Sequence, residues 1–228
     1  MSSKKIIVAL DSDNFENCLN LIQLLKSDAF AFKIGYEFFF NFGLKGYNII
    51  QNEKVKIFLD LKLHDIPNTV HKGILAINKL KPYFTTIHLS GGDEMQKISN
   101  KSKNNIKILG VSILTSLESS QTKKYYYNER IEEIVADYTI SALKNNLNGI
   151  VCSPKEIKII KKISLNKLII VTPGNRINDD KKIEDDQKRT MTPGEAIEAG
   201  SDFLVVGRPI TQSKKPLEVL QSINSEIE

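Results

Sequence analysis

The chain has 228 residues, which suits one large domain or two small ones and is ample for a sizeable hydrophobic core. Hydrophobic residues make up 41% and charged residues 26%, the balance of an ordinary globular protein, and no apolar run approaches the ~20 residues that span a bilayer. The net charge of +5 is a mild basic excess without a basic–aromatic cluster, so we expect no nucleic-acid partner and no membrane partner, whereas an anionic small-molecule substrate fits.

Short apolar runs alternate with amphipathic stretches along the whole chain. We predict eight strands, at residues 6–10, 29–34, 56–62, 84–89, 106–114, 149–152, 168–171 and 202–206. Each strand is followed by a helical pattern, and these helices end near residues 26, 51, 80, 102, 147, 163, 199 and 227. Residues 115–128 and 175–190 are predicted to be polar loops.

Near-continuous apolar strands that alternate with helices indicate a parallel sheet covered by helices. Eight strand–helix units in 228 residues fit a closed (β/α)8 TIM barrel better than an open doubly wound sheet. No segment has the composition of a linker, so we predict an α/β fold with a single domain over residues 1–228.

The most informative stretch ends the third predicted strand and reads Asp60-Leu-Lys-Leu-His-Asp-Ile-Pro-Asn-Thr69. Asp60 and Lys62 are two residues apart, so on a strand their side chains project from the same face. A buried unpaired charge is costly, so the two need each other, and Asp65 adds a second carboxylate just beyond the strand. A lysine held among carboxylates is a candidate proton donor that is kept charged.

The same triplet also has a purely structural interpretation. Asp60, Lys62 and Asp65 can form a solvated salt bridge at a strand-to-helix turn, with Asp65 as the helix N-cap and Pro67 in the first turn. The triplet alone leaves both interpretations open.

The ends of the other predicted strands favour a functional site. In a barrel of this type the active site is built at the C-terminal ends of the strands. The residues that fall at these ends are Asp11, Lys33, Asp60, Lys62, His88, Ser90, Thr115, Pro173, Arg176, Gly207 and Arg208. A closed barrel brings all these ends together, so they indicate one common site.

Gly207 and Arg208, after the last predicted strand, have the character of a phosphate site. The loops after strands seven and eight often hold a phosphate in this fold; glycine lets backbone N–H groups approach an anion, and Arg208 can add bidentate hydrogen bonds. Arg176 and Gln187 lie in or beside the long charged loop after strand seven, which we interpret as either plain surface or a lid.

Histidines and cysteines carry weaker signals. We expect His64 beside the charged cluster, His71 on a helix surface and His88 lining the barrel; no pair has metal-ligand spacing, so we predict no metal.

Cys18 and Cys152 lie far apart in apolar contexts, which is typical of buried free thiols in a reducing compartment. Because the N-terminus also lacks a signal-peptide pattern, we expect a cytoplasmic protein.

These motifs together make the sequence resemble the orotidine 5′-phosphate decarboxylases of the short bacterial type, nearly from end to end. Residues 60–69 are the most specific piece. The supporting pieces occur in the family's order: Ala9-Leu-Asp11, Phe32-Lys-Ile-Gly35, Leu114-Thr-Ser116, Val171-Thr-Pro-Gly-Asn-Arg176, Asp186-Gln187, Met191-Thr-Pro193 and Val206-Gly-Arg208. The resemblance implies a homodimeric barrel that converts orotidine 5′-phosphate to UMP and carbon dioxide, the last step of de novo pyrimidine nucleotide synthesis, without a metal or organic cofactor.

The resemblance also implies roles by position. The residues that match the family's charged catalytic array are Lys33, Asp60, Lys62 and Asp65, with Asp65 contributed by the partner subunit. Ribose contacts are implied for Asp11, Lys33, Asp65 and Thr69, a pyrimidine pocket for Thr115 and Pro173, and phosphate contacts for Arg176, Gln187, Gly207 and Arg208.

The implied reaction assigns the main role to Lys62. Loss of carbon dioxide leaves a carbanion on the pyrimidine ring that no nearby carbonyl accepts as a simple enolate, so Lys62 is expected to act as cation and general acid. Asp60 would lie near the substrate carboxylate, and its expected role is to hold Lys62 in place. Phosphate binding far from the reacting carbon would drive closure of the loop.

Two other functions compete with this one. A 3-keto-gulonate-phosphate decarboxylase or hexulose-phosphate synthase shares Asp-x-Lys-x-x-Asp but works through a metal-bound enediolate; the continuation His64-Asp-Ile-Pro-Asn-Thr69 and the Asp186-Gln187 pair argue against it. A barrel that only binds a nucleotide or a partner protein would show no turnover, and the complete charged set argues against that alternative.

Overall fold

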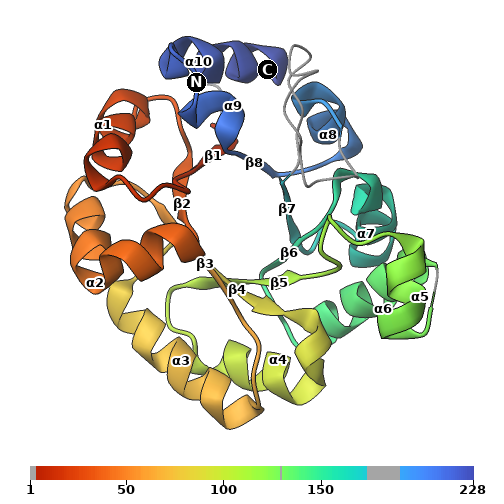
Figure 1. Cartoon of the computed structure of the whole chain (residues 1–228). Coiled ribbons are helices and arrows are strands. Elements are labelled where there is room, and N and C mark those ends of the chain that lie inside the picture. Colours follow the sequence, from red (N-terminus) through yellow and green to blue (C-terminus); the bar gives the residue numbers. More distant parts are fainter. Residues whose placement is uncertain (1–3, 129, 174–190) are drawn as a thin grey trace.

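The structure is a computed structural model and describes residues 4–128, 130–173 and 191–228. Eight parallel strands form one closed barrel in sequence order, and β8 pairs with β1 to complete the ring (Figure 1). The strands are β1 (Ile6–Ala9), β2 (Ala31–Ile34), β3 (Ile57–Leu63), β4 (Phe84–His88), β5 (Lys107–Val111), β6 (Gly149–Val151), β7 (Ile169–Pro173) and β8 (Phe203–Val206). This confirms the predicted (β/α)8 barrel.

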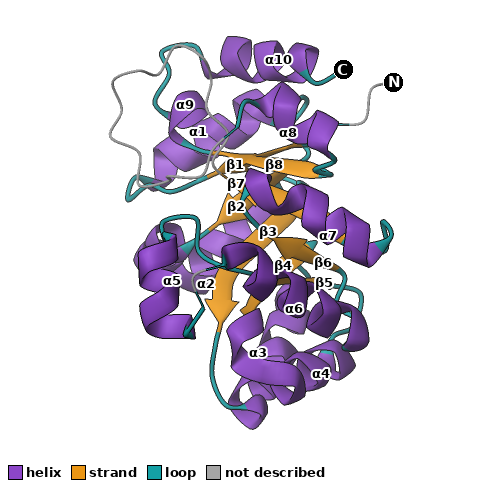
Figure 2. Ribbon diagram, turned by 90° about the vertical axis from the view of Figure 1, so that its right-hand side faces the viewer, coloured by secondary structure: helices purple, strands orange, loops and turns teal. Residues whose placement is uncertain are grey.

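Helices surround the barrel, and the side view shows the strands in the centre with helices outside them (Figure 2). The main helices are α1 (Phe15–Leu25), α2 (Tyr36–Asn52), α3 (Pro67–Leu80), α4 (Gly92–Ser102), α6 (Ile131–Lys144), α7 (Ile157–Ser164), α8 (Pro193–Ala199) and α10 (Pro216–Glu226). Two further helices are α5 (Ser119–Tyr126) and α9 (Arg208–Thr211), and 3₁₀ turns lie at Leu89–Gly91 and Pro154–Glu156. In the described part of the chain, none of the helices is long and apolar enough to cross a membrane.

Alternation along the strands divides the apolar residues into two cores. The core of the barrel interior consists of Ile7, Ala9, Ala31, Phe58, Phe84, Leu109, Val171 and Val205. The residues between them, such as Val8 and Phe32, belong to the larger core between the strands and the helices. Two residues beyond Ala9, Ala31 and Phe58 on the same face lie Asp11, Lys33 and Asp60. The strand period therefore places these charges above the interior core, at the C-terminal end of the barrel.

Aromatic rings fill the opposite, N-terminal end of the barrel. The ring centroids of Phe30 and Phe203 are 4.1 Å apart, and Phe84 lies 5.7 Å from both Phe203 and Phe58. The interior is thus a packed core rather than a pore, as the fold requires. Polar chemistry inside the barrel is therefore expected at its C-terminal end.

One predicted loop contains a helix, and a short helix that was not predicted follows β8. Residues 115–128 contain α5, which begins with a capping box: the Glu118 side chain accepts from the N3 backbone, and the Gln121 side chain accepts from the backbone N–H of Glu118 at 3.2 Å. The segment after β8 turns at once into α9, with Pro209 in its first turn. The predicted loop at 175–190 lies outside the described residues.

Candidate active site

Four charged side chains form an alternating chain across the C-terminal ends of β1, β2 and β3. The Lys33 ammonium lies 3.1 Å from Asp11 Oδ1 and 3.8 Å from Asp60 Oδ2. The Lys62 ammonium lies 2.7 Å from the same Asp60 oxygen. We call Asp11, Lys33, Asp60 and Lys62 the charged array. Its members lie on β2 and β3 and directly after β1, so the closed barrel is what brings them together.

The backbone of β3 is irregular where it carries the array. Phe58 and Leu59 pair with Phe84 and Thr85 of β4, but the next pair is Leu63 with Ile87, so the register shifts between them. Lys62 lies in this bulge with φ 44°, a left-handed conformation that is uncommon for a residue with a side chain. Bulges often re-aim a side chain next to an active site, and such strain persists only where surrounding contacts fix it.

Asp60 is the most buried member of the array, with 8% of the residue exposed. Burial by itself raises the pKa of this carboxyl, but the charges of Lys33 and Lys62 and hydrogen bonds from Lys62 and Thr86 outweigh burial, so the pKa is lowered. The buried carboxylate therefore stays ionised and provides a fixed negative charge beside the Lys62 ammonium.

Aromatic side chains border the array. The Tyr36 hydroxyl donates to the carbonyl of Leu61 at 3.2 Å, and its ring centroid lies 5.9 Å from the Lys62 ammonium. Burial, and then the charge of Asp60, raises the pKa of Tyr36. On the other side the rings of His64 and His88 are 5.1 Å apart, and burial, followed by the influence of His64 and Lys62, lowers the pKa of His88. The expectations for both histidines are thus supported by their positions.

Asp65 lies apart from the array in this chain. It is exposed, and among the described residues its carboxylate accepts a hydrogen bond from the backbone N–H of Ile66 at 2.6 Å. Ile66, not Asp65, is the N-cap of α3, and Pro67 occupies the first turn as predicted. The interpretation of Asp65 as an N-cap is therefore wrong, because the chain enters the helix one residue later. Thr69, in the first turn, is also exposed.

Four of the remaining predicted site residues are described, and they lie at the same end of the barrel. Pro173 ends β7 opposite Val205, and Gly207 follows β8 directly, where an added Cβ would come within 3.5 Å of the Ala9 side chain. Arg208 is exposed at the start of α9. Thr115 lies in the turn after β5, beyond the end of that strand at Val111. Arg176 and Gln187 lie outside the described residues, so no placement is given to them.

Thr86 and Tyr36 belong to the site but were not predicted from the sequence. Thr86 Oγ1 donates to Asp60 Oδ1 at 2.9 Å and accepts from the backbone N–H of Lys62 at 2.9 Å. The alternation that places Phe84 inside the barrel also places Thr86 there, so the strand period is a signal that points to this residue. Tyr36 follows Gly35 at the start of α2 and has no comparable signal.

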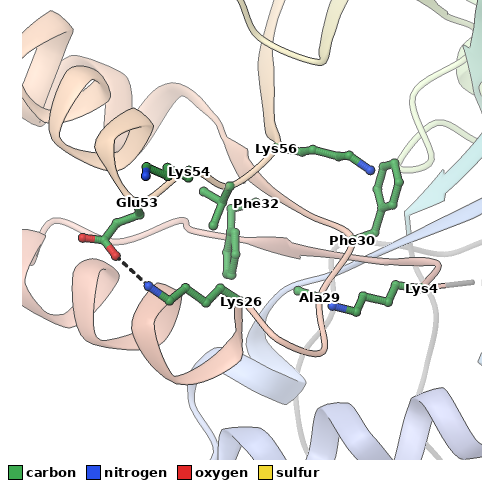
Figure 3. Close-up of a pocket in the computed structure, with 9 residues that line it drawn as sticks. Lys4, Lys26, Ala29, Phe30, Phe32, Glu53, Lys54 and Lys56 are labelled. Carbon is green, nitrogen blue, oxygen red and sulfur yellow. Dashed lines mark hydrogen bonds and ion pairs between the residues drawn. The ribbon is translucent and has the colours of Figure 1, made fainter. Parts of the chain in front are cut away.

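A hollow of about 470 Å³ at the opposite end of the barrel does not resemble this site (Figure 3). Its lysines point in different directions: Lys26 pairs with Glu53 at 3.1 Å, and the Lys56 ammonium lies 4.2 Å from the centroid of the Phe30 ring. Across residues 4–128, 130–173 and 191–228, no group of three or more His, Cys, Asp or Glu side chains is arranged to hold a metal ion.

Comparison with known proteins identifies the family. The model of the Orotidine 5'-phosphate decarboxylase / HUMPS family matches residues 4–223. The chain belongs to this family. An orotidine 5′-phosphate decarboxylase of Wigglesworthia glossinidia brevipalpis is 39% identical over 231 residues, covering 100% of this chain and 99% of the relative. One of Coxiella burnetii is 39% identical over 98% of this chain and 96% of the relative.

A solved structure agrees with the sequence relatives. The crystal structure of orotidine 5′-phosphate decarboxylase from Lactobacillus acidophilus superposes with a TM-score of 0.84 at 34% identity, over 99% of this chain and 100% of that one. These matches confirm the family resemblance predicted from the sequence. They also confirm the prediction that the chain is a carboxy-lyase.

Proposed function

We propose that this chain converts orotidine 5′-phosphate to UMP and carbon dioxide in pyrimidine nucleotide synthesis, with Lys62 as cation and proton donor. The observation that carries the proposal is the Lys62 ammonium, 2.7 Å from a buried and ionised Asp60 at the C-terminal end of the barrel. The names of the relatives, which align over almost their full length, support the choice of substrate.

The proposed reaction breaks one carbon–carbon bond and forms one carbon–hydrogen bond. As carbon dioxide departs, its bonding electron pair stays on the pyrimidine carbon. The Lys62 ammonium stabilises that negative charge and then gives a proton to the same carbon, and solvent protonates the neutral amine again. The array needs no reorganisation during this step, because Asp60 already fixes the position of Lys62.

The remaining array members support the geometry of Lys62. One Asp60 oxygen accepts from Thr86 and the other faces both Lys62 and Lys33, so the carboxylate has a fixed orientation. Lys33 in turn is held by Asp11, whose side chain is half exposed at the mouth of the barrel. We assign Asp11 and Lys33 to the ribose hydroxyls, because Asp11 is the most exposed member of the array and Lys33 pairs with it.

The phosphate is assigned to Gly207 and Arg208, together with Arg176 and Gln187, and the pyrimidine to Thr115 and Pro173. A Cβ added to Gly207 would lie 3.5 Å from the Cβ of Ala9, which lies below the array. Arg208, the next residue after Gly207, is exposed. Arginine binds phosphate with paired hydrogen bonds, and binding energy from a remote phosphate can be used at the reacting carbon.

We further propose that the active form is a homodimer in which Asp65 and Thr69 serve the partner subunit's array. Both residues are exposed and lie on the first turn of α3 or just before it. Exposed apolar side chains support a partner: Ile66, next to Asp65 in the chain, is 67% exposed, and Phe40, whose ring stacks 5.8 Å from that of Tyr36, is 78% exposed. Exposed apolar groups of this size favour a protein interface when they are close together.

A cytoplasmic location is part of the same proposal. Cys18 and Cys152 are both buried, and Cys18 is a thiol outside any disulfide, as expected in a reducing compartment. Burial raises the pKa of the Cys18 thiol to about 11, which keeps it protonated and unreactive.

The test of this function is loss of orotidine 5′-phosphate absorbance with purified protein in excess chelator. Rapid conversion to UMP supports the proposal. Activity that appears only with added magnesium, and toward a sugar phosphate, would instead assign the chain to the metal-dependent branch of the family.

A further inference from the structure

Thr86 connects the two central members of the array through a single hydroxyl. It lies on β4, is fully buried at 0% exposure, and its Oγ1 is 2.9 Å from Asp60 Oδ1 and 2.9 Å from the backbone nitrogen of Lys62. The hydroxyl donates its one proton to the carboxylate and accepts a hydrogen bond from the backbone N–H, so it acts as both donor and acceptor.

The register of β3 and β4 explains why a side chain is needed at this position. Leu59 pairs with Thr85 and Leu63 pairs with Ile87, so three residues of β3 face one residue of β4. The regular ladder therefore cannot satisfy the backbone of the bulge. The Thr86 hydroxyl replaces a ladder partner for the N–H of Lys62, the residue with the left-handed φ of 44°.

We propose that Thr86 is a positioning residue that holds the bulged backbone of Lys62 and the carboxylate of Asp60 in the geometry required for proton donation by Lys62. This inference rests on the function proposed above. Thr86 acts through its two partners, because its hydroxyl is occupied by the Asp60 carboxylate and the Lys62 backbone. The neighbouring Thr85, also fully buried, donates to the carbonyl of Leu59, the last regularly paired residue before the bulge, at 3.0 Å, and not to Asp60 or Lys62.

The environment of Asp60 makes the effect of the hydroxyl measurable. The titratable groups near this carboxylate are Lys33 on β2, Lys62 on β3, His88 on β4 and Tyr36 on α2. A substitution at Thr86 leaves all four of these titratable side chains in the sequence. Removing the hydroxyl takes away one of the hydrogen bonds that lower the pKa of Asp60, so this pKa should rise.

The kinetic test compares three variants in the full-length protein. Thr86→Val has nearly the same shape but no hydroxyl, Thr86→Ser keeps the hydroxyl, and Thr85→Val removes a hydroxyl next to the bulge. We expect Thr86→Val to lower kcat about 100-fold with an unchanged Kd for UMP, because small displacements of a reacting group cost this much. Thr86→Ser and Thr85→Val should stay within a few-fold of wild type. Should Thr86→Val not fold, Thr86→Ala is the substitute.

A second readout does not depend on turnover. The Asp60 carboxyl carbon is titrated by 13C NMR in wild type, Thr86→Val and Thr85→Val, and only Thr86→Val should show a raised pKa. Wild-type kcat and an unchanged titration in Thr86→Val would overturn the inference, as would an equal loss of kcat in Thr85→Val. If wild type does not decarboxylate orotidine 5′-phosphate, the proposed function fails, whereas the titration still decides whether Thr86 positions Asp60.

Discussion

The ammonium of Lys62 lies 2.7 Å from Oδ2 of Asp60, at the point where β3 leaves its regular pairing with β4. A strand without the bulge would also place these side chains on one face, but the left-handed backbone at Lys62 gives the pair its actual orientation. The Thr86 hydroxyl accepts a hydrogen bond from the backbone N–H of Lys62, and Lys33 lies between Asp60 and the more exposed Asp11. The account predicts measurable effects for each of these contacts.

Replacing Asp60 should reduce stability more than replacing Asp11. Asp60→Asn leaves Lys33 and Lys62 facing a neutral buried amide, and we expect the free energy of unfolding to fall by about 2 kcal/mol, less than for a fully buried pair because Lys62 is partly exposed. Asp11 is half exposed, so Asp11→Asn should cost less than about 1 kcal/mol. Urea denaturation of both variants measures the difference, and equal losses would contradict it.

His88 should make the fold less stable in mild acid. Its pKa is lowered in the folded chain from the ordinary 6.5, chiefly by burial, so the unfolded chain takes up a proton more readily. Stability is then fully present above pH 6.5 and is lost as the pH falls through that value toward the folded pKa. His88→Asn should show a shallower fall in the free energy of unfolding between neutral and mildly acidic pH. Parallel curves for the two proteins would refute this role of His88.

Arg208 should contribute strongly to binding of the product UMP. Loss of hydrogen bonds to a charged phosphate is worth about 1.5–3 kcal/mol, so Arg208→Ala should raise the Kd about 10- to 100-fold in calorimetric titration. Lys214→Ala is the matched control, because Lys214 is also exposed, lies after the same strand and carries the same charge. Equal effects of the two substitutions would indicate general electrostatic attraction instead of a phosphate site.

The shared active site can be tested by mixing two inactive variants. Lys62→Ala and Asp65→Ala should each lack activity as homodimers. After unfolding and refolding together, half of the dimers are hybrids with one intact site, so about one quarter of wild-type activity should return. Activity that stays at the level of the separate variants would mean that Asp65 does not act across an interface.

The sequence predicted the barrel because its strongest pattern, apolar strands alternating with amphipathic helices, is a property of the whole chain. The position of polar residues at the C-terminal ends of strands also predicted that Asp11, Lys33, Asp60 and Lys62 lie at one end of the barrel. Asp65, which was predicted beside Asp60 and Lys62, lies apart from them in this chain. The prediction that Asp60 and Lys62 form an ion pair followed from the free-energy cost of burying either charge alone.

Other features depend on tertiary register, which local sequence does not encode. The bulge in β3 exists only relative to β4, so neither the φ of Lys62 nor the bridging role of Thr86 could be predicted from residues 57–63 alone. The helix α5 was missed because its polar composition is that of a loop, although Glu118 and Gln121 have capping-box spacing. The predicted N-cap of α3, Asp65, lies one residue before the observed N-cap, Ile66.

The most direct test of the central claim is the turnover number of Lys62→Ala with orotidine 5′-phosphate, measured beside the Kd of the same variant for UMP. Turnover should be abolished while UMP still binds, because Gly207 and Arg208, to which the phosphate is assigned, follow β8, whereas Lys62 lies on β3. Turnover near the wild-type value would contradict the role of Lys62 as the cation and proton donor.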